Sequence, residues 1–171
     1  MPSGYLLDTN VISELMKPRP ARSVAEWIET TPEELLYLSV ITIGEIRKGI
    51  DLLDEREPKR AALQSWLDWD VRVRFAGRLL AFDGGAAERW GQVEAFAQRQ
   101  RLPLPTVDAQ LAATALHHGL TFVTRNTDDV RSTGVRPEFR YSTPGRAGRD
   151  WSGGAERDRT DDLMSGPGDI L

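Results

Sequence analysis

The sequence contains no cysteine and only two histidines among its 171 residues. The lack of cysteine excludes disulfide bonds, thiolate zinc sites and a cysteine nucleophile. The two histidines, His117 and His118, are neighbours, and adjacent side chains on a helix point about 100° apart, so they make a poor pair of metal ligands. We expect them instead to end a helix just before Gly119.

Long apolar runs and a secretory leader are also missing. No stretch approaches the roughly 20 apolar residues of a membrane span, and residues 1–4 lead straight into a short apolar run. These absences predict a soluble, cytoplasmic protein without membrane contact. The net charge of −4 lacks the basic excess that is typical of nucleic-acid binders. A site built of carboxylates is compatible with that balance, because the formal count leaves out the cations that it would bind.

Short apolar segments alternate with helical patterns along the chain. The expected strands are residues 5–7, 35–40, 79–82 and 120–123, with a fifth over 135–141 that Pro137 confines to an edge or shortens. The expected helices are 11–17, 23–28, one from Thr42, one from Pro58, 86–100 and 107–117, with a turn at Gly84-Gly85. This order predicts an α/β domain in three layers, α/β/α, around a mainly parallel sheet of about four to five short strands.

The composition changes near residue 142. From there to residue 171 the chain is rich in glycine, arginine and aspartate and has almost no apolar periodicity. We therefore expect a domain over residues 1–141 and a disordered tail over residues 142–171.

Acidic side chains occur where the predicted strands end and where helices begin. Asp8 follows the first strand, whereas Glu45 and Asp108 lie in the first turns of two helices. Ligands of parallel sheets bind beyond the carboxyl ends of the strands, so these acids could share one cleft. Carboxylates brought together raise each other's pKa unless a divalent cation neutralises them, and oxygen ligands select Mg²⁺ or Mn²⁺. Such a site can activate water against a phosphodiester.

Each acid also has a purely structural interpretation. Residues 8–10 could cap the helix that follows, through Thr9 or Asn10, and Glu45 could form a capping box with Thr42. Asp108 could favour the positive end of its helix. The chemistry of the residues alone leaves both interpretations open.

Four segments, in order and spacing, resemble bacterial PIN domains of the VapC and FitB type. They are 5–15 (YLLDTNVISEL), 39–50 (SVITIGEIRKGI), 105–115 (PTVDAQLAATA) and 119–126 (GLTFVTRN). The resemblance covers roughly residues 4 to 136. It implies a PIN-like fold and the activity of a Mg²⁺- or Mn²⁺-dependent endoribonuclease, the toxin of a type II toxin–antitoxin system.

The resemblance also implies roles for particular residues. The family's acids match Asp8, Glu45 and Asp108, which would be catalytic and hold the metal. Thr9 and Thr124 fall where the family has small hydroxyl residues near the metal. The fourth acidic position of the family falls at Asn126 or at Asp129, which are possible supporting ligands.

The implied partners are an RNA substrate, a VapB-type antitoxin and a second copy of the chain. In this family an antitoxin segment enters the cleft and commonly places an arginine near the acids, where its charge opposes them as a metal does. Residues 136–141 depart from the family, because they run into the tail where members have a closing strand and a short Asn-Pro-Trp ending.

Two other functions remain open. The departures at Asn126 and at the C-terminal end suit a catalytically weak or inert PIN module that only binds antitoxin and, through it, operator DNA. A phosphatase of the haloacid dehalogenase class also begins with an aspartate after its first strand. That chemistry needs a second aspartate where this chain has Asn10, and a later lysine, whereas Lys59 is the last one.

Overall fold

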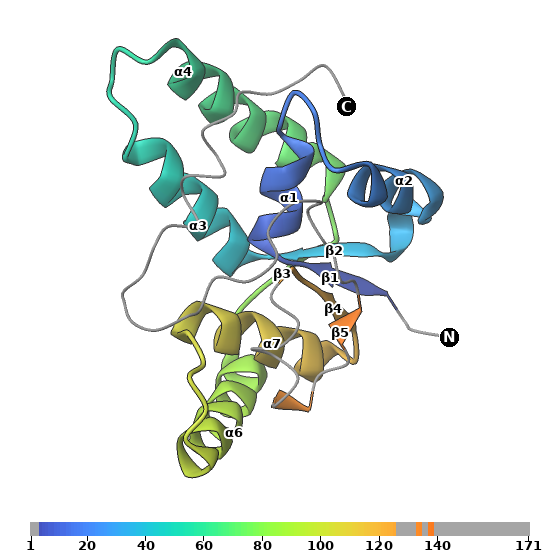
Figure 1. Ribbon diagram of the computed structural model, residues 1–171, viewed down its shortest axis with the longest axis vertical. Coiled ribbons are helices and arrows are strands. Elements are labelled where there is room, and N and C mark those ends of the chain that lie inside the picture. Colours follow the sequence, from blue (N-terminus) through green and yellow to red (C-terminus); the bar gives the residue numbers. More distant parts are fainter. Residues whose placement is uncertain (1–3, 126–132, 135–136, 139–171) are drawn as a thin grey trace, which may run out of the picture.

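The computed structural model describes residues 4–125, 133–134 and 137–138, and their centre is a parallel sheet (Figure 1). The strands are β1 (Tyr5–Leu7), β2 (Leu36–Ser39), β3 (Leu79–Leu80), β4 (Thr121–Val123) and β5 (Pro137–Glu138). They are ordered β3-β2-β1-β4-β5, and every pairing is parallel. The first strand of the chain therefore lies in the middle of the sheet.

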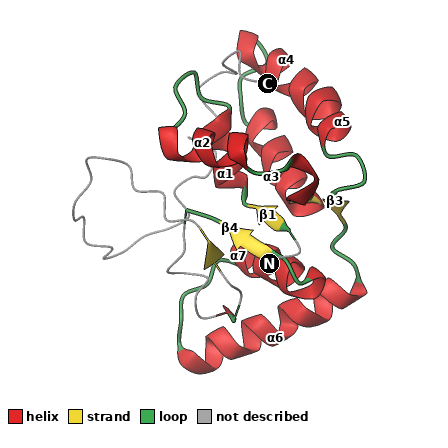
Figure 2. Cartoon of the chain, turned by 90° about the vertical axis from the view of Figure 1, so that its right-hand side faces the viewer, coloured by secondary structure: helices red, strands yellow, loops and turns green. Residues whose placement is uncertain are grey.

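Helices cover both faces of this sheet (Figures 1 and 2). One face carries α1 (Thr9–Leu15), α2 (Arg22–Thr30), α3 (Val40–Asp51), α4 (Pro58–Ser65), the π-helix η2 (Trp66–Val71) and α5 (Arg72–Arg74). A 3₁₀ turn, η1 (Glu33–Leu35), leads into β2. The other face carries α7 (Thr106–His118), against which α6 (Gly84–Gln100) packs. The predicted three-layer α/β/α architecture is confirmed.

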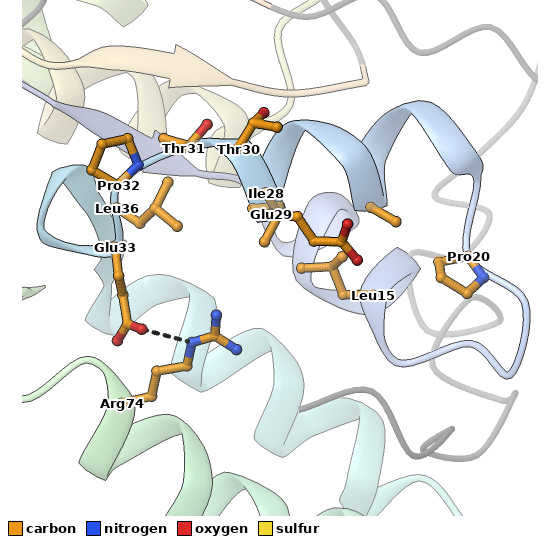
Figure 3. A pocket seen from close by; sticks show the side chains of 11 residues that line it. Leu15, Pro20, Ile28, Glu29, Thr30, Thr31, Pro32, Glu33, Leu36 and Arg74 are labelled. Carbon is orange, nitrogen blue, oxygen red and sulfur yellow. Dashed lines mark ion pairs between the residues drawn. The ribbon is translucent and has the colours of Figure 1, made fainter.

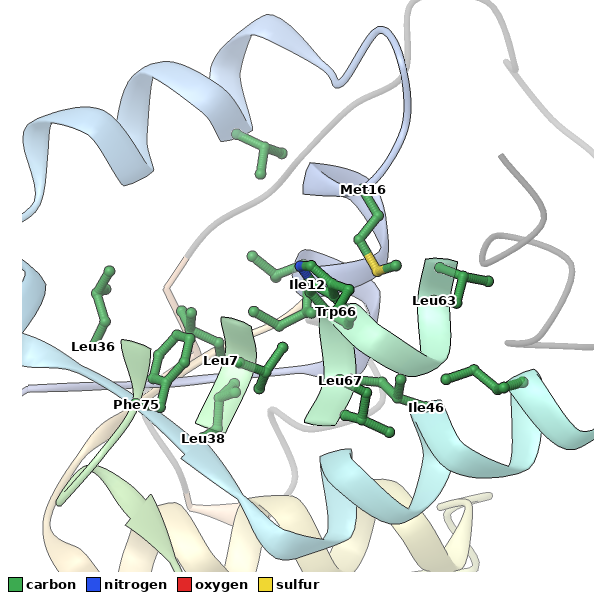
Figure 4. Packing of buried hydrophobic residues seen from close by; sticks show 14 of the residues in the cluster. Leu7, Ile12, Met16, Leu36, Leu38, Ile46, Leu63, Trp66, Leu67 and Phe75 are labelled. Atoms are coloured by element: carbon green, nitrogen blue, oxygen red, sulfur yellow. The ribbon is translucent and has the colours of Figure 1, made fainter. Parts of the chain in front are cut away.

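Successive side chains of β1 serve two separate cores. Leu7 lies in the larger core with Ile46 of α3 and Leu67 of η2 (Figure 4). Leu6 points to the opposite face, where it packs with Leu111 of α7 and with Phe122 of β4. All six side chains are fully buried. This alternation follows from the two-residue period of a strand, and it explains why the short run at residues 5–7 is apolar throughout.

The register of the central strands determines where Asp8 lies. Leu7 of β1 is paired with Val123 of β4, and the backbone N–H of Asp8 donates to the carbonyl oxygen of Val123 at 2.9 Å. The ladder thus continues one residue beyond β1. Asp8 and Thr124, which follow these two strands, are consequently neighbours at the carboxyl edge of the sheet.

Two predictions for the C-terminal part of the chain fall wholly or partly outside the described residues. The predicted strand at 135–141 is described only at Pro137–Glu138, where it is the edge strand β5, and its other residues lie outside the described part. The expected tail at 142–171, and with it the domain boundary, also lies outside the described residues.

The predicted turn at Gly84-Gly85 is wrong, because these two residues open α6. Asp83 caps that helix by accepting a hydrogen bond from the backbone N–H of Ala86 at 3.0 Å. An added Cβ at Gly85 would lie 2.2 Å from Cε1 of His117, so the glycine provides room for that ring. The predicted helix end at Gly119 is confirmed, since Gly119 has the left-handed φ of 64°.

No helix among the described residues is long and apolar enough to cross a membrane.

Candidate metal centre

Asp8 occupies the N-cap position of α1, but its side chain does not cap this helix. The helix begins at Thr9, and the side chain of Asp8 makes no capping hydrogen bond. The predicted capping by Thr9 or Asn10 is therefore also wrong, because both residues are inside the first turn. All three side chains are buried. Their polar groups are thus directed to one another and to neighbouring elements instead of to the helix end.

The two carboxylate oxygens of Asp8 have different surroundings. Oδ2 accepts hydrogen bonds from Nδ2 of Asn10 at 3.0 Å and from Oγ1 of Thr124 at 2.6 Å. Oδ1 is buried and accepts no hydrogen bond from the described residues. A buried carboxylate oxygen without a donor is costly, which makes a bound cation a suitable partner for Oδ1.

Glu45 belongs to the same group of side chains. Its Oε2 accepts a hydrogen bond from Oγ1 of Thr9 at 2.5 Å. The predicted capping box of Thr42 and Glu45 is wrong, since α3 begins at Val40 and its cap is Ser39, whose side chain accepts from the backbone N–H of Ile41. Glu45 therefore lies in the middle of α3 and not at its capping end.

Asp108 is the third predicted acid, and it lies in the first turn of α7 with 1% of its surface exposed. The N-cap of this helix is Pro105, which makes no side-chain capping bond. Helix α7 contacts both α3, which carries Glu45, and β4, which directly precedes Thr124. Burial of a carboxylate at this position favours compensation by positive charge, from the helix end and from a cation.

The donor set suits a hard divalent cation. Asp8, Glu45 and Asp108 offer only oxygen atoms, and Mg²⁺ and Mn²⁺ prefer such ligands. Within the described residues, however, no three acidic or histidine side chains converge as a ready-made metal cage. Mg²⁺ does not require such a cage, because it commonly keeps several waters and binds through one or two carboxylates. The buried Oδ1 of Asp8 together with this oxygen-only chemistry fits a metal of that kind.

The remaining predicted ligands, Asn126 and Asp129, lie outside the described residues. Arg125 precedes them, directly after Thr124, and is exposed.

A separate pocket of about 660 Å³ opens beside α2 and η1 (Figure 3). Its lining includes Leu15, Ile28 and Thr31, and Arg74 lies 3.9 Å from Glu33 at its rim. None of the site residues Asp8, Thr9, Glu45, Asp108 and Thr124 lines it. The chemistry described above is therefore independent of this pocket.

The model of the PIN domain family matches residues 5–134, which contain every residue of the site. The chain belongs to the PIN domain family. This membership supports the resemblance that the four sequence segments indicated. It also removes the basis for the haloacid dehalogenase alternative, whose second aspartate is here Asn10, a hydrogen-bond donor to Asp8.

Individual PIN proteins are similar over most of the chain. Toxin FitB of Neisseria gonorrhoeae is 39% identical over 122 residues, which are 71% of this chain and 87% of that protein. The VapC ribonuclease Y4jK of Sinorhizobium fredii is 38% identical over 130 residues, 76% of this chain and 92% of the relative. The crystal structure of FitAcB from Neisseria gonorrhoeae superposes with a TM-score of 0.73 at 37% identity, covering 78% of this chain and 95% of that one. The PIN domain is thus of the VapC and FitB type.

Sequence reasoning missed one functional contact in this PIN domain. Asn10 was considered as a helix cap and as the position where a haloacid dehalogenase has its second aspartate, whereas its amide donates to Asp8. The signal was available in the spacing, because a residue two positions after a strand-ending aspartate, in the first helical turn, can reach back to that carboxylate.

Proposed function

We propose that this chain is a metal-dependent endoribonuclease that acts as the toxin of a type II toxin–antitoxin system. One observation carries the proposal: in a PIN domain of the VapC and FitB type, a fully buried aspartate keeps one oxygen without a hydrogen-bond donor among the described residues. The printed names of the relatives, a toxin and a ribonuclease, support the same activity.

In the proposed reaction, Asp8 and Asp108 would hold Mg²⁺ or Mn²⁺, and Glu45 would orient the attacking water or bind the same ion. The bound metal would lower the pKa of that water and stabilise the charge that develops on the phosphodiester oxygens. The chain's own residues supply position. Thr9 holds Glu45, Thr124 holds Asp8, and the carboxylates of Asp8 and Asp108 are buried from bulk water.

The proposed partners are RNA as substrate and a VapB-type antitoxin as inhibitor. A basic side chain of the antitoxin near the acids would oppose their charge and exclude the metal, since arginine and a divalent cation neutralise carboxylates in the same way. A homodimer through the early helices and the supporting roles of Asn126 and Asp129 are further parts of this proposal.

The second candidate is an inert PIN module that binds antitoxin without cutting RNA. The observation in its favour is that no metal cage of three acidic or histidine side chains is preformed in the described part of the chain. The two candidates differ in one measurable property, which is RNA cleavage that depends on metal and on Asp8.

The test is cleavage of a mixed RNA pool by the purified chain with Mg²⁺, Mn²⁺ or EDTA. Asp8→Asn removes the charge at nearly constant volume, and we expect it to lower the rate by at least about 100-fold, an effect expected when a metal ligand is lost. Asp70→Asn is the matched control, because Asp70 is an exposed aspartate outside the group of proposed site residues. Cleavage that survives EDTA, or equal cleavage by Asp8→Asn, would contradict the proposal. A folded protein that cuts no RNA under any condition favours the inert module.

A further inference from the structure

The carboxylate of Asp8 is held from two sides by neutral donors. Asn10 approaches from the first turn of α1, and Thr124 approaches from the residue after β4. Both donors meet the same oxygen, Oδ2, and both are buried, with 5% of Asn10 and 1% of Thr124 exposed. Water therefore cannot readily replace either donor.

Two donors on one oxygen fix the rotation of the carboxylate. The terminal torsion of an aspartate is broad, so an unrestrained carboxylate can exchange the positions of its two oxygens. Hydrogen bonds from Asn10 and Thr124 break that equivalence, because only Oδ2 has donors while Oδ1 is buried without one in the described part of the chain. The backbone bond from Asp8 to Val123 fixes the main chain at the same point.

Neutral donors preserve the charge of the carboxylate. An arginine or lysine at either position would pair with Asp8 and compete with a cation, whereas an amide and a hydroxyl orient the group and bring no charge of their own. The two oxygens can then divide their tasks between the protein and a metal.

We infer that Asn10 is a positioning residue for the metal, acting with Thr124 on Oδ2 of Asp8 so that Oδ1 remains for the divalent cation. The inference rests on the proposed function for the presence of a metal, and it assigns to Asn10 a role in the affinity of the site. Asn10 itself touches neither RNA nor the metal.

The decisive measurement is the affinity of the chain for Mn²⁺ in the absence of RNA. Electron paramagnetic resonance measures this affinity. Asn10→Ala removes the amide donor, and we expect Mn²⁺ affinity to fall about 10- to 100-fold, as is typical for the loss of a residue that orients a metal ligand. Thr124→Val removes the hydroxyl at nearly constant volume and should cause a loss of similar size. The double variant should lose less than the product of the two single losses, because both donors restrain the same oxygen.

Two matched variants separate positioning from general damage. Thr124→Ser retains the hydroxyl and should recover most of the affinity that Thr124→Val loses. Ser13→Ala removes another buried polar group of α1, which has no hydrogen-bond partner among the described residues, and should keep the affinity. If Asn10→Ala fails to fold, the comparison of Thr124→Val with Thr124→Ser still tests the shared restraint on Oδ2.

The outcomes distinguish this inference from the proposed function. Mn²⁺ binding that is lost in Asp8→Asn and weakened in Asn10→Ala supports the inference even if RNA is not cut, in which case only the nuclease proposal fails. Unchanged affinity in a folded Asn10→Ala overturns the inference while leaving the nuclease proposal intact. Failure of the wild-type chain to bind Mn²⁺ through Asp8 overturns both.

Discussion

Thr9 donates its hydroxyl to Oε2 of Glu45 at 2.5 Å, and this bond joins the first turn of α1 to the middle of α3. Three consecutive residues thereby have three different tasks. Asp8 has one oxygen without a donor among the described residues, Thr9 donates to Glu45, and Asn10 donates to Asp8. The acids are thus held by local side chains before any ligand arrives.

Replacing Thr9 tests this arrangement. Thr9→Val removes the donor to Glu45 at nearly constant volume, and we expect metal-dependent RNA cleavage to fall about 10- to 100-fold because Glu45 loses its orientation. Thr9→Ser retains the hydroxyl and should retain most of the rate. Equal cleavage by the valine and serine variants, both folded by circular dichroism, would show that the bond is dispensable.

The packing of Gly85 against His117 predicts that Gly85→Ala destabilises the chain when the His117 ring is present and stabilises it when the ring is removed. Gly85→Ala should lower the free energy of unfolding by about 1–3 kcal/mol, because the new Cβ meets the ring of His117. In a His117→Ala background the same change should stabilise the chain, by up to about 1 kcal/mol, since alanine favours a helix over glycine.

Urea unfolding of the four proteins of this cycle measures both effects. A destabilisation that persists without the His117 ring would place its cause elsewhere in α6.

The core residue Leu67 offers a matched pair of truncations. Leu67→Ala should cost about 2–5 kcal/mol of unfolding free energy, because this leucine is fully buried in the larger core. Val73→Ala, at a site with 71% of the side chain exposed, should change it by less than about 0.5 kcal/mol. Similar losses in both variants by chemical denaturation would contradict the packing described for η2.

Stability should decrease towards acid pH through His118 and Asp83. Burial lowers the pKa of His118, with repulsion from His117 adding to it, and the hydrogen bond from Ala86 lowers the pKa of Asp83. In both cases the unfolded chain takes up protons more readily, so unfolding becomes easier as pH falls. The loss begins below about pH 6.5 for His118 and below about pH 4 for Asp83.

Urea midpoints at pH 7.5, 5.5 and 3.5 measure this dependence. We expect His118→Gln to reduce the change between pH 7.5 and 5.5, and Asp83→Asn to reduce the change below pH 4. A wild-type midpoint that rises on acidification would contradict both assignments.

The sequence predicts features that depend on neighbouring residues better than features that depend on contacts between distant parts of the chain. Apolar runs such as Tyr5–Leu7 and Thr121–Val123 predicted the central strands, because a strand buried on both faces needs apolar side chains throughout. The acids Asp8, Glu45 and Asp108, predicted as site residues from their places beside these elements, are buried or half-buried in the structure. Their bonding partners were not predicted.

The errors occurred where tertiary contacts override local signals. Gly84-Gly85 has the composition of a turn, but His117 from α7 occupies the space beside Gly85, and Asp83 provides the cap that starts the helix earlier. Asn10 is a residue type that commonly caps helices, but here its side-chain amide donates a hydrogen bond to the carboxylate of Asp8. The π-helix η2 had no sequence signal that we recognised.

The bond between Thr124 and Asp8 spans 116 positions of the chain. During translation Asp8 leaves the ribosome early, and Thr124 follows only after nearly all of the α/β layers have been made. At roughly 5–20 residues per second, that interval lasts several seconds or longer. Throughout it, the nascent chain has Asp8 without its β4 neighbour and without one of the two donors that orient it. Completion of the site is therefore among the last events in the synthesis of the domain, and a truncated product of an interrupted ribosome would lack it.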